Sequence, residues 1–149
     1  MNDLKSRLKI YEGTKEYQQK IGYFKNDRFF TYKDSLGKPT IGYGHLLTTS
    51  EKYPGGLSIE EAEALLDKDI AIARSQLSRL NVVVPHDWED FLIIMLFQLG
   101  LGGVMKFRGM LSALRANDYK RAVVEARDSL WYRQTPNRVD QMVAVLTNK

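Results

Sequence analysis

Hydrophobic positions follow a helical period in the first and last parts of the chain, whereas a stretch between them lacks this period. Leu4, Leu8 and Tyr11 recur at helical spacing, which predicts a short first helix that ends near Gly13. Between residues 22 and 44, aromatic, β-branched and glycine residues replace that period, as is typical of strands and turns. After residue 56 the helical period returns and continues towards the C-terminus.

The middle stretch predicts a small antiparallel sheet. Residues 23–25 and 29–33 are expected to pair as a hairpin, because Asn26-Asp27 between them suits a tight turn. The sequence Asp34-Ser35-Leu36-Gly37 predicts the next turn, which leads into a third strand at residues 39–43.

The helical part is predicted to begin with a capping box at Ser58 and Glu61, whose side chains can each bond the other's backbone donor. Apolar residues then recur every three or four positions as far as Leu80, which predicts a long amphipathic helix. Residues 88–99 are apolar on almost every face, which indicates a helix buried at a domain centre. Two later helices are expected to start at Asn117-Asp118 and at Thr135-Pro136.

These patterns together predict an α+β fold with one domain over residues 1–149. A sheet lobe is expected at about residues 14–57 and a linking helix at about residues 58–80. A larger helical lobe is expected at about residues 81–149, together with the N-terminal helix.

The composition limits the chemistry that is available. The chain has no cysteine, which excludes disulfides, thiolate nucleophiles and zinc–thiolate sites. Its net charge of +4 favours encounter with polyanions such as nucleic acid, an anionic membrane surface or a bacterial wall that carries acidic polymers. The N-terminus lacks the apolar run of a secretory signal, and the longest apolar run, residues 91–97, is too short to span a bilayer. We therefore expect a protein that is made in the cytosol and does not insert stably into a membrane.

Two acidic residues and a hydroxyl are the candidate chemical groups. Glu12 lies at the end of the first predicted helix, where a negative charge is unfavourable against the helix dipole, and this together with burial would raise its pKa. Asp34 lies at a predicted turn, six positions before Thr40. Glycoside hydrolysis usually needs one protonated and one ionised carboxyl group on opposite sides of a sugar bond. Taken alone, Glu12 also fits a solvated acid at a helix end, Asp34 an ordinary turn residue and Thr40 an ordinary strand residue.

Four segments of the chain together carry a resemblance to a known family. They are Tyr11-Glu12-Gly13, Tyr32-Lys33-Asp34-Ser35 running into Thr40-Ile41-Gly42-Tyr43-Gly44-His45-Leu46-Leu47, Phe97-Gln98-Leu99-Gly100 with Gly103-Val104 and Phe107, and Trp131-Tyr132-Arg133-Gln134-Thr135-Pro136-Asn137-Arg138. In this order, and over nearly the whole chain, they make it resemble the phage-type lysozymes, the T4 endolysin-like muramidases of glycoside hydrolase family 24. The resemblance implies a lysozyme-like fold and a muramidase that needs no cofactor and no metal.

The resemblance also implies roles for individual residues. Glu12 would donate the proton, Asp34 would be the second carboxylate, and Thr40 would position the attacking water, which implies an inverting reaction. Arg138 would pair with Glu12 and orient it, and such a partner would lower the pKa that burial raises; the sequence leaves open which effect prevails. The substrate contacts would be Leu46, Phe97, Gln98, Met110 and Glu125, of which the last two differ in residue type from the family's.

The chain departs from the family between its two acids. Asp34 follows Glu12 by 22 positions, whereas the family's acids are about nine apart. Glu16 and Asp27 therefore compete as the acid and the second carboxylate, although both fit solvated surface positions better. We expect the inserted segment, within residues 14–26, to add a short helix and one strand at the edge of the lobe and to widen the wall-binding surface.

Several other residues are expected to be structural. The resemblance implies that His45 forms an ion pair with Asp69, a position on the long helix, and takes no part in catalysis. His86 is expected in an exposed loop, whereas Trp131 and Tyr132 are expected in the core. Phe97 is as compatible with the core as with a sugar contact.

The expected function is that of an endolysin that cleaves the β-1,4 bond between N-acetylmuramic acid and N-acetylglucosamine in bacterial peptidoglycan. Such a protein would be a monomer, would bind no nucleic acid, and would wait in the host cytoplasm until a holin releases it to the wall. Three alternatives stay open: a virion tail-associated lysozyme, which residues 127–132 favour; a non-hydrolytic wall-binding module; and a basic membrane-disrupting protein.

Overall fold

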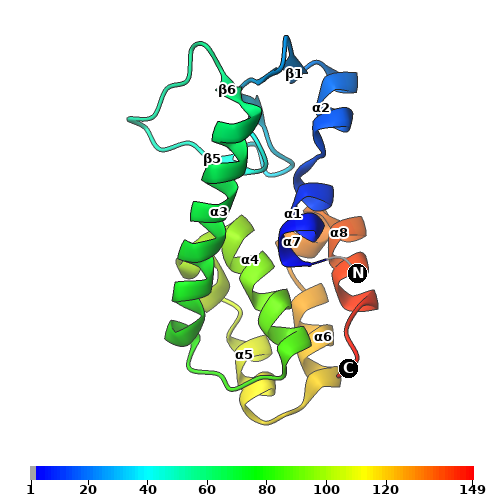
Figure 1. The fold of residues 1–149 in the computed structure, drawn as a ribbon. Coiled ribbons are helices and arrows are strands. Elements are labelled where there is room, and N and C mark those ends of the chain that lie inside the picture. The colour runs from blue at the N-terminus through cyan, green and yellow to red at the C-terminus, as the bar shows by residue number, and fades with distance from the viewer. Residues whose placement is uncertain (1–2) are drawn as a thin grey trace. The chain divides into compact units, whose positions relative to one another are not determined.

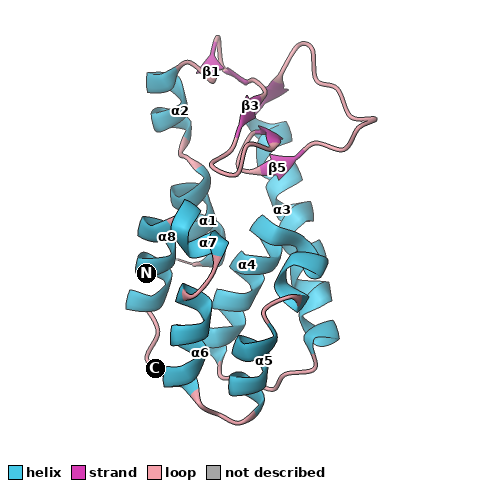
Figure 2. Cartoon of the chain, turned by 180° about the vertical axis from the view of Figure 1, so that it is seen from behind, coloured by secondary structure: helices cyan, strands magenta, loops and turns pink. Residues whose placement is uncertain are grey.

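The computed structural model describes residues 3–149, which form two compact units (Figure 1). The first unit extends to Ala71 and the second comprises Ile72–Lys149, so the long helix α3 (Ile59–Gln76) passes through the boundary. Strands occur in the first unit only, among the described residues, as the colouring in Figure 2 shows. The fold is α+β, as predicted; the single catalytic domain over residues 1–149 stays a prediction.

The strands of the first unit form two small antiparallel sheets within the described part of the chain. The strands are β1 (Phe24–Lys25), β2 (Arg28–Phe29), β3 (Tyr32–Lys33), β4 (Pro39–Ile41), β5 (His45–Leu46) and β6 (Leu57–Ser58). The strand order is β1-β2-β6 in one sheet and β3-β4-β5 in the other.

The predicted hairpin is confirmed at its turn, where Asn26 and Asp27 both have positive φ values, of 53° and 60°. The prediction of one strand over residues 29–33 in a single sheet is wrong, because β2 and β3 belong to different sheets. The Arg28 guanidinium donates to the carbonyl groups of Gly55 and Gly56, and this distant segment supplies β6 as the partner of β2. Alternation of residue types along the chain carries no signal for such a contact.

Helix α1 (Leu4–Glu12) is held on the first-unit part of α3 by ion pairs. Lys5 Nζ lies 3.0 Å from Glu63 and 2.9 Å from Asp67, and Lys9 Nζ lies 2.6 Å from Glu63. The helix ends where predicted, since Gly13 has a φ of 108° and donates its N–H to the Lys9 carbonyl. These contacts fix the end of the helix that carries Glu12.

The inserted segment forms the predicted short helix and edge strand. Helix α2 (Lys15–Ile21) is capped by the Thr14 hydroxyl, which accepts from the Tyr17 N–H, and it ends at Gly22 in the left-handed region. Strand β1 follows and pairs with β2 at the edge of its sheet. Packing of Phe24 on Phe29, with ring centroids 4.7 Å apart, joins the segment to the lobe's apolar core.

The second unit is built around helix α4 (His86–Met105). Residues 91–98 of this helix are all buried, as the uniformly apolar sequence predicts. Gly100 has φ 75° and ψ 168°, so the helix is interrupted directly after residue 99. By length and composition α4 could cross a membrane, but half of its most apolar window is buried inside the protein, as in a core helix.

Shorter helical elements surround α4 in the second unit. They are η1 (Leu77–Leu80), α5 (Arg108–Arg115), α6 (Tyr119–Arg127), α7 (Leu130–Gln134) and α8 (Pro136–Ala144). The predicted starts are confirmed: Asp118 accepts from the Arg121 N–H to cap α6, and Pro136 is the first residue of α8. The capping box is confirmed too, because Ser58 and Glu61 exchange hydrogen bonds of 2.8 and 3.1 Å.

The structural predictions for aromatic and histidine side chains have mixed outcomes. Trp131 is buried, as predicted, with its ring edge-to-face against Phe91 and Phe107. Tyr132 is only partly buried, and its hydroxyl donates to Asp140, so its assignment to the core is wrong. His86 is exposed, but it is the first residue of α4 rather than a loop residue.

Candidate active site

Glu12 is the last residue of α1, and its side chain lies directly against the backbone of Gly44. A methyl group placed on Gly44 would be 2.6 Å from Glu12 Cγ and 2.8 Å from Oε1, closer than van der Waals contact allows. Glu12 is partly buried, and its backbone carbonyl accepts from the Tyr32 hydroxyl at 3.3 Å. A side chain at position 44 would therefore displace either the Glu12 side chain or the turn that contains Gly44.

Asp34 is held by the turn that it begins. Its Oδ1 accepts from the N–H groups of Leu36 and Lys38, at 2.9 and 2.8 Å. Oδ2 accepts no hydrogen bond from the residues that the structure describes. One oxygen thus fixes the carboxylate, and the other is available to a water or a sugar hydroxyl.

Thr40 lies on β4, opposite Tyr32 on one side and Leu46 on the other. Its side chain is buried, and the hydroxyl donates to the Lys38 carbonyl at 2.8 Å. The oxygen keeps lone pairs that can accept from a water, so the arrangement permits the predicted role. Leu46 is partly buried on β5, next to Thr40. The structure thus brings Glu12, Asp34, Thr40 and Leu46 into one unit.

The two competing acids lie in different surroundings. Glu16 is exposed in the first turn of α2, where the helix dipole stabilises a negative charge. Asp27 is exposed at the tip of the β1–β2 hairpin. Neither carboxylate has the burial or the backbone contacts that distinguish Glu12 and Asp34.

The remaining predicted sugar contacts lie in the second unit. Phe97 and Gln98 are buried in α4, and Gln98 Oε1 accepts from the Trp131 indole N–H at 2.9 Å. The NH₂ group of Gln98 can donate to an acceptor such as an acetamido carbonyl. Met110 is completely buried on α5, which does not favour its assignment as a sugar contact.

Glu125 and Arg138 are also residues of the second unit. Glu125 is partly buried on α6 and forms an ion pair of 3.2 Å with Arg121. Its carboxyl group occupies the place that a methyl group on Gly109 would take. Arg138 is partly buried on α8. Its orienting role, and the sugar contacts assigned to this unit, stay predictions.

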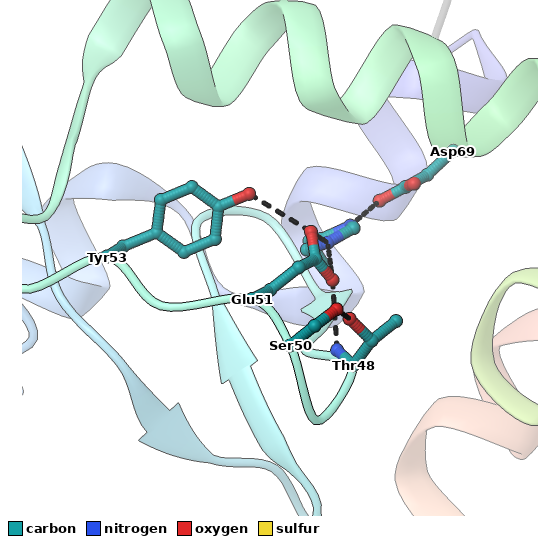
Figure 3. A network of polar contacts seen from close by, with 6 residues as sticks. Thr48, Ser50, Glu51, Tyr53 and Asp69 are labelled. Carbon is teal, nitrogen blue, oxygen red and sulfur yellow. Dashed lines mark hydrogen bonds and ion pairs between the residues drawn. The ribbon is translucent and has the colours of Figure 1, made fainter.

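His45 forms the predicted ion pair with Asp69, and a second carboxylate joins it. His45 Nδ1 lies 2.7 Å from Asp69 and Nε2 lies 3.0 Å from Glu51. Figure 3 shows how Glu51 also accepts from the Thr48 N–H and from the Tyr53 hydroxyl. The network joins the loop after β5 to α3. That His45 takes no part in catalysis stays a prediction. Among residues 3–149, no group of three or more histidine, aspartate and glutamate side chains is arranged to hold a metal.

This network predicts a specific pH dependence of stability. The hydrogen bond to Asp69 raises the pKa of His45 against the opposing effect of burial, and Glu51 raises it further. The His45 contribution is therefore complete below the unfolded-state pKa, about 6.5, and is lost as pH rises through the higher folded-state value. The Thr48 N–H lowers the pKa of Glu51 to about 2, so that contribution is lost only as pH falls towards this value.

Urea unfolding of the wild type and His45→Asn at pH 6 and pH 9 measures this dependence. We expect the stability difference between the two proteins to be larger at pH 6 than at pH 9. An equal difference at both pH values would show that His45 gains no charge-dependent stabilisation from Asp69 and Glu51.

Comparisons with known proteins show which family the chain belongs to. The family model for phage lysozyme matches residues 24–147. The chain belongs to the phage lysozyme family. The match begins after Glu12, so it includes Asp34 and Thr40 but not Glu12 or most of the inserted segment.

The relatives of this protein differ greatly in length. The chain is similar to the pre-baseplate central spike protein Gp5 of Enterobacteria phage T4, with 33% identity over 80% of the chain but only 25% of the spike protein. It is 28% identical to probable T4-type lysozyme 1 of Dictyostelium discoideum, over 85% of the chain and 90% of that protein. It is 26% identical to peptidoglycan hydrolase gp36 of Pseudomonas phage phiKMV, over 96% of the chain and 16% of the relative. The family and these names support a hydrolase with a lysozyme-type function.

Sequence reasoning missed two features of the site. Gln18 is buried and donates to the carbonyl groups of Gly13 and Gly42, although glutamine in a polar helix gives no sign of burial. Gly44 belongs to the motif at residues 40–47, but the motif alone does not indicate its contact with Glu12. A signal for Gly44 existed, since alternating glycines at 42 and 44 indicate positive φ or a close approach.

Proposed function

We propose that this protein is an N-acetylmuramidase, which hydrolyses the β-1,4 bond between N-acetylmuramic acid and N-acetylglucosamine in bacterial peptidoglycan. The observation that carries the proposal is the packing of the Glu12 side chain on Gly44, in the same unit as Asp34 and Thr40. Membership of the phage lysozyme family supports it, and so does the name of the phiKMV relative, a peptidoglycan hydrolase.

In the proposed mechanism Glu12 donates its proton to the glycosidic oxygen as the bond to C1 of the sugar breaks. The electron pair of that bond remains on the leaving oxygen, which becomes a hydroxyl group. Asp34 Oδ2 accepts a proton from a water positioned by Thr40, and the water oxygen bonds to C1 from the opposite face. Inversion at C1 is the expected outcome, and proton exchange with solvent restores both carboxyl groups.

The new reducing end identifies the bond that is cleaved. Digested peptidoglycan is reduced with borohydride and hydrolysed, and its sugar alcohols are then identified. A muramidase yields muramitol, whereas cleavage of the other glycosidic bond yields glucosaminitol. Glucosaminitol alone, or products without a reducing end, would contradict the proposed reaction.

We further propose that the protein acts as an endolysin, held in the host cytoplasm until a holin releases it to the wall. The similarity to the Gp5 spike protein supports a second candidate, a virion tail-associated lysozyme. Detection of the protein in purified virions would favour the tail role. Lysis of cells that express it, dependent on a co-expressed holin, would favour the endolysin role.

A further inference from the structure

Gln18 occupies an unusual place in the inserted helix α2. Its side chain is 1% exposed, in a helix whose other residues are partly or fully exposed. The amide Nε2 donates to the Gly13 carbonyl and to the Gly42 carbonyl, both at 2.9 Å. Because both partners are acceptors, the NH₂ group must face them, and the orientation of the amide is determined. Oε1 is buried and accepts no hydrogen bond from the described residues.

The two carbonyl groups belong to the two backbone segments that border Glu12. Gly13 is the next residue after Glu12, and Gly42 begins the turn whose Gly44 contacts the Glu12 side chain. Gln18 therefore joins the end of α1 to the Gly42–Gly44 turn through one amide group. Both N–H bonds are used, so loss of the amide would leave two buried carbonyl groups without this donor.

A second contact of the inserted segment reaches the same place. The ring of Tyr23 stacks on Tyr32, with centroids 4.9 Å apart and planes 11° from parallel. The Tyr32 hydroxyl donates to the Glu12 carbonyl. The segment thus supports the backbone of Glu12 from two directions.

We propose that Gln18 is a positioning residue for Glu12, so that the inserted segment serves to hold the acid and not to enlarge the wall-binding surface. The proposal rests on the proposed hydrolysis with Glu12 as proton donor. It differs from a binding role in a measurable way, since a misplaced acid lowers kcat, whereas a lost binding surface raises KM.

The test compares Gln18→Met with Gln19→Met, assayed on soluble peptidoglycan fragments well below the thermal midpoint of each variant. Gln19 lies on the same helix and is exposed, so Gln19→Met makes the same chemical change without removing the two hydrogen bonds of Gln18. We expect kcat of Gln18→Met to fall about 10- to 100-fold with KM nearly unchanged, and Gln19→Met to match the wild type. The alkaline limb of the kcat–pH profile should also move, because it reports the acid in the bound complex.

Two further variants separate positioning from general destabilisation. Phe24→Leu weakens the packing of the inserted segment on Phe29 but leaves both Gln18 hydrogen bonds in place, so it should lower the thermal midpoint but leave kcat and its pH profile unchanged. Gln18→Asn retains the amide group on a side chain that is too short to reach both carbonyl groups, and we expect an intermediate kcat. If Gln18→Met does not fold, Gln18→Asn takes its place in the comparison.

The outcomes distinguish failure of this proposal from failure of the hydrolysis itself. An active wild type with unchanged kcat in the Gln18 variants would overturn the positioning role alone. A raised KM with normal kcat would also overturn the positioning role. It would instead support a wall-binding role for the inserted segment. A wild type without turnover would overturn both proposals.

Discussion

Replacing Glu12 with glutamine is expected to reduce peptidoglycan hydrolysis by about 10³-fold or more, while the fold is kept. Glutamine has nearly the same shape, so it can occupy the space beside Gly44, but it cannot donate the proton that the leaving oxygen requires. General acid catalysis typically contributes 10²–10⁴-fold, and departure of a sugar oxygen without a proton is slow. Turnover numbers and circular dichroism spectra of both proteins measure the two parts of this expectation.

Glu16→Gln is the matched control for this experiment. Glu16 is exposed at the start of α2, so its replacement removes one surface charge, and the turnover number should stay within about twofold. Loss of activity in Glu16→Gln, with normal activity in Glu12→Gln, would assign the acid to the inserted segment. That result would contradict the contact geometry on which the assignment of Glu12 rests.

Replacing Gly44 with alanine is expected to have the second largest effect, a loss of activity of about 10²-fold or more. The added methyl group would lie 2.6–2.8 Å from three atoms of the Glu12 side chain, so either the carboxyl group or the turn must move. A displacement of about 1 Å in a catalytic group can cost about 100-fold in rate. The substitution also forces alanine to a φ of +86°, which costs about 1–2 kcal/mol of stability.

Gly22→Ala separates these two effects. Gly22 has a φ of +90° but no atom within 4 Å of the position that a methyl group would occupy. It should therefore show a similar loss of stability in urea unfolding, with hydrolysis close to that of the wild type. If both alanine variants lost activity equally, backbone strain alone would explain the result, and the close contact between Gly44 and Glu12 would have no catalytic importance.

Much of the fold could be predicted from the sequence because its signals are local. The Ser58–Glu61 capping box, the glycine at the end of α1 and the proline at the start of α8 each depend on residues within one helical turn. The Asn26-Asp27 turn likewise specifies its own hairpin. The sheets are less predictable, because β2 pairs with β6 from a distant part of the chain, and the Arg28 side chain bonds carbonyl groups 27 and 28 positions away.

The candidate site was predictable only in part, for the same reason. Motifs indicated Glu12, Asp34 and Thr40 as chemical groups, and the short turn that fixes Asp34 is visible in the sequence. The support of the acid is not visible, because Gln18 bridges carbonyl groups at residues 13 and 42, which only folding brings together. The buried Met110 shows the converse, that alignment to a family position does not reveal whether a side chain can be reached.

The most direct test of the central claim measures wall binding and reducing-end formation together, on the same purified peptidoglycan. If this chain is a muramidase, the wild type sediments with the insoluble wall and releases reducing ends that increase with time. Stable binding to the wall without any increase in reducing ends would contradict the claim and would make the protein a lysozyme-fold binding module.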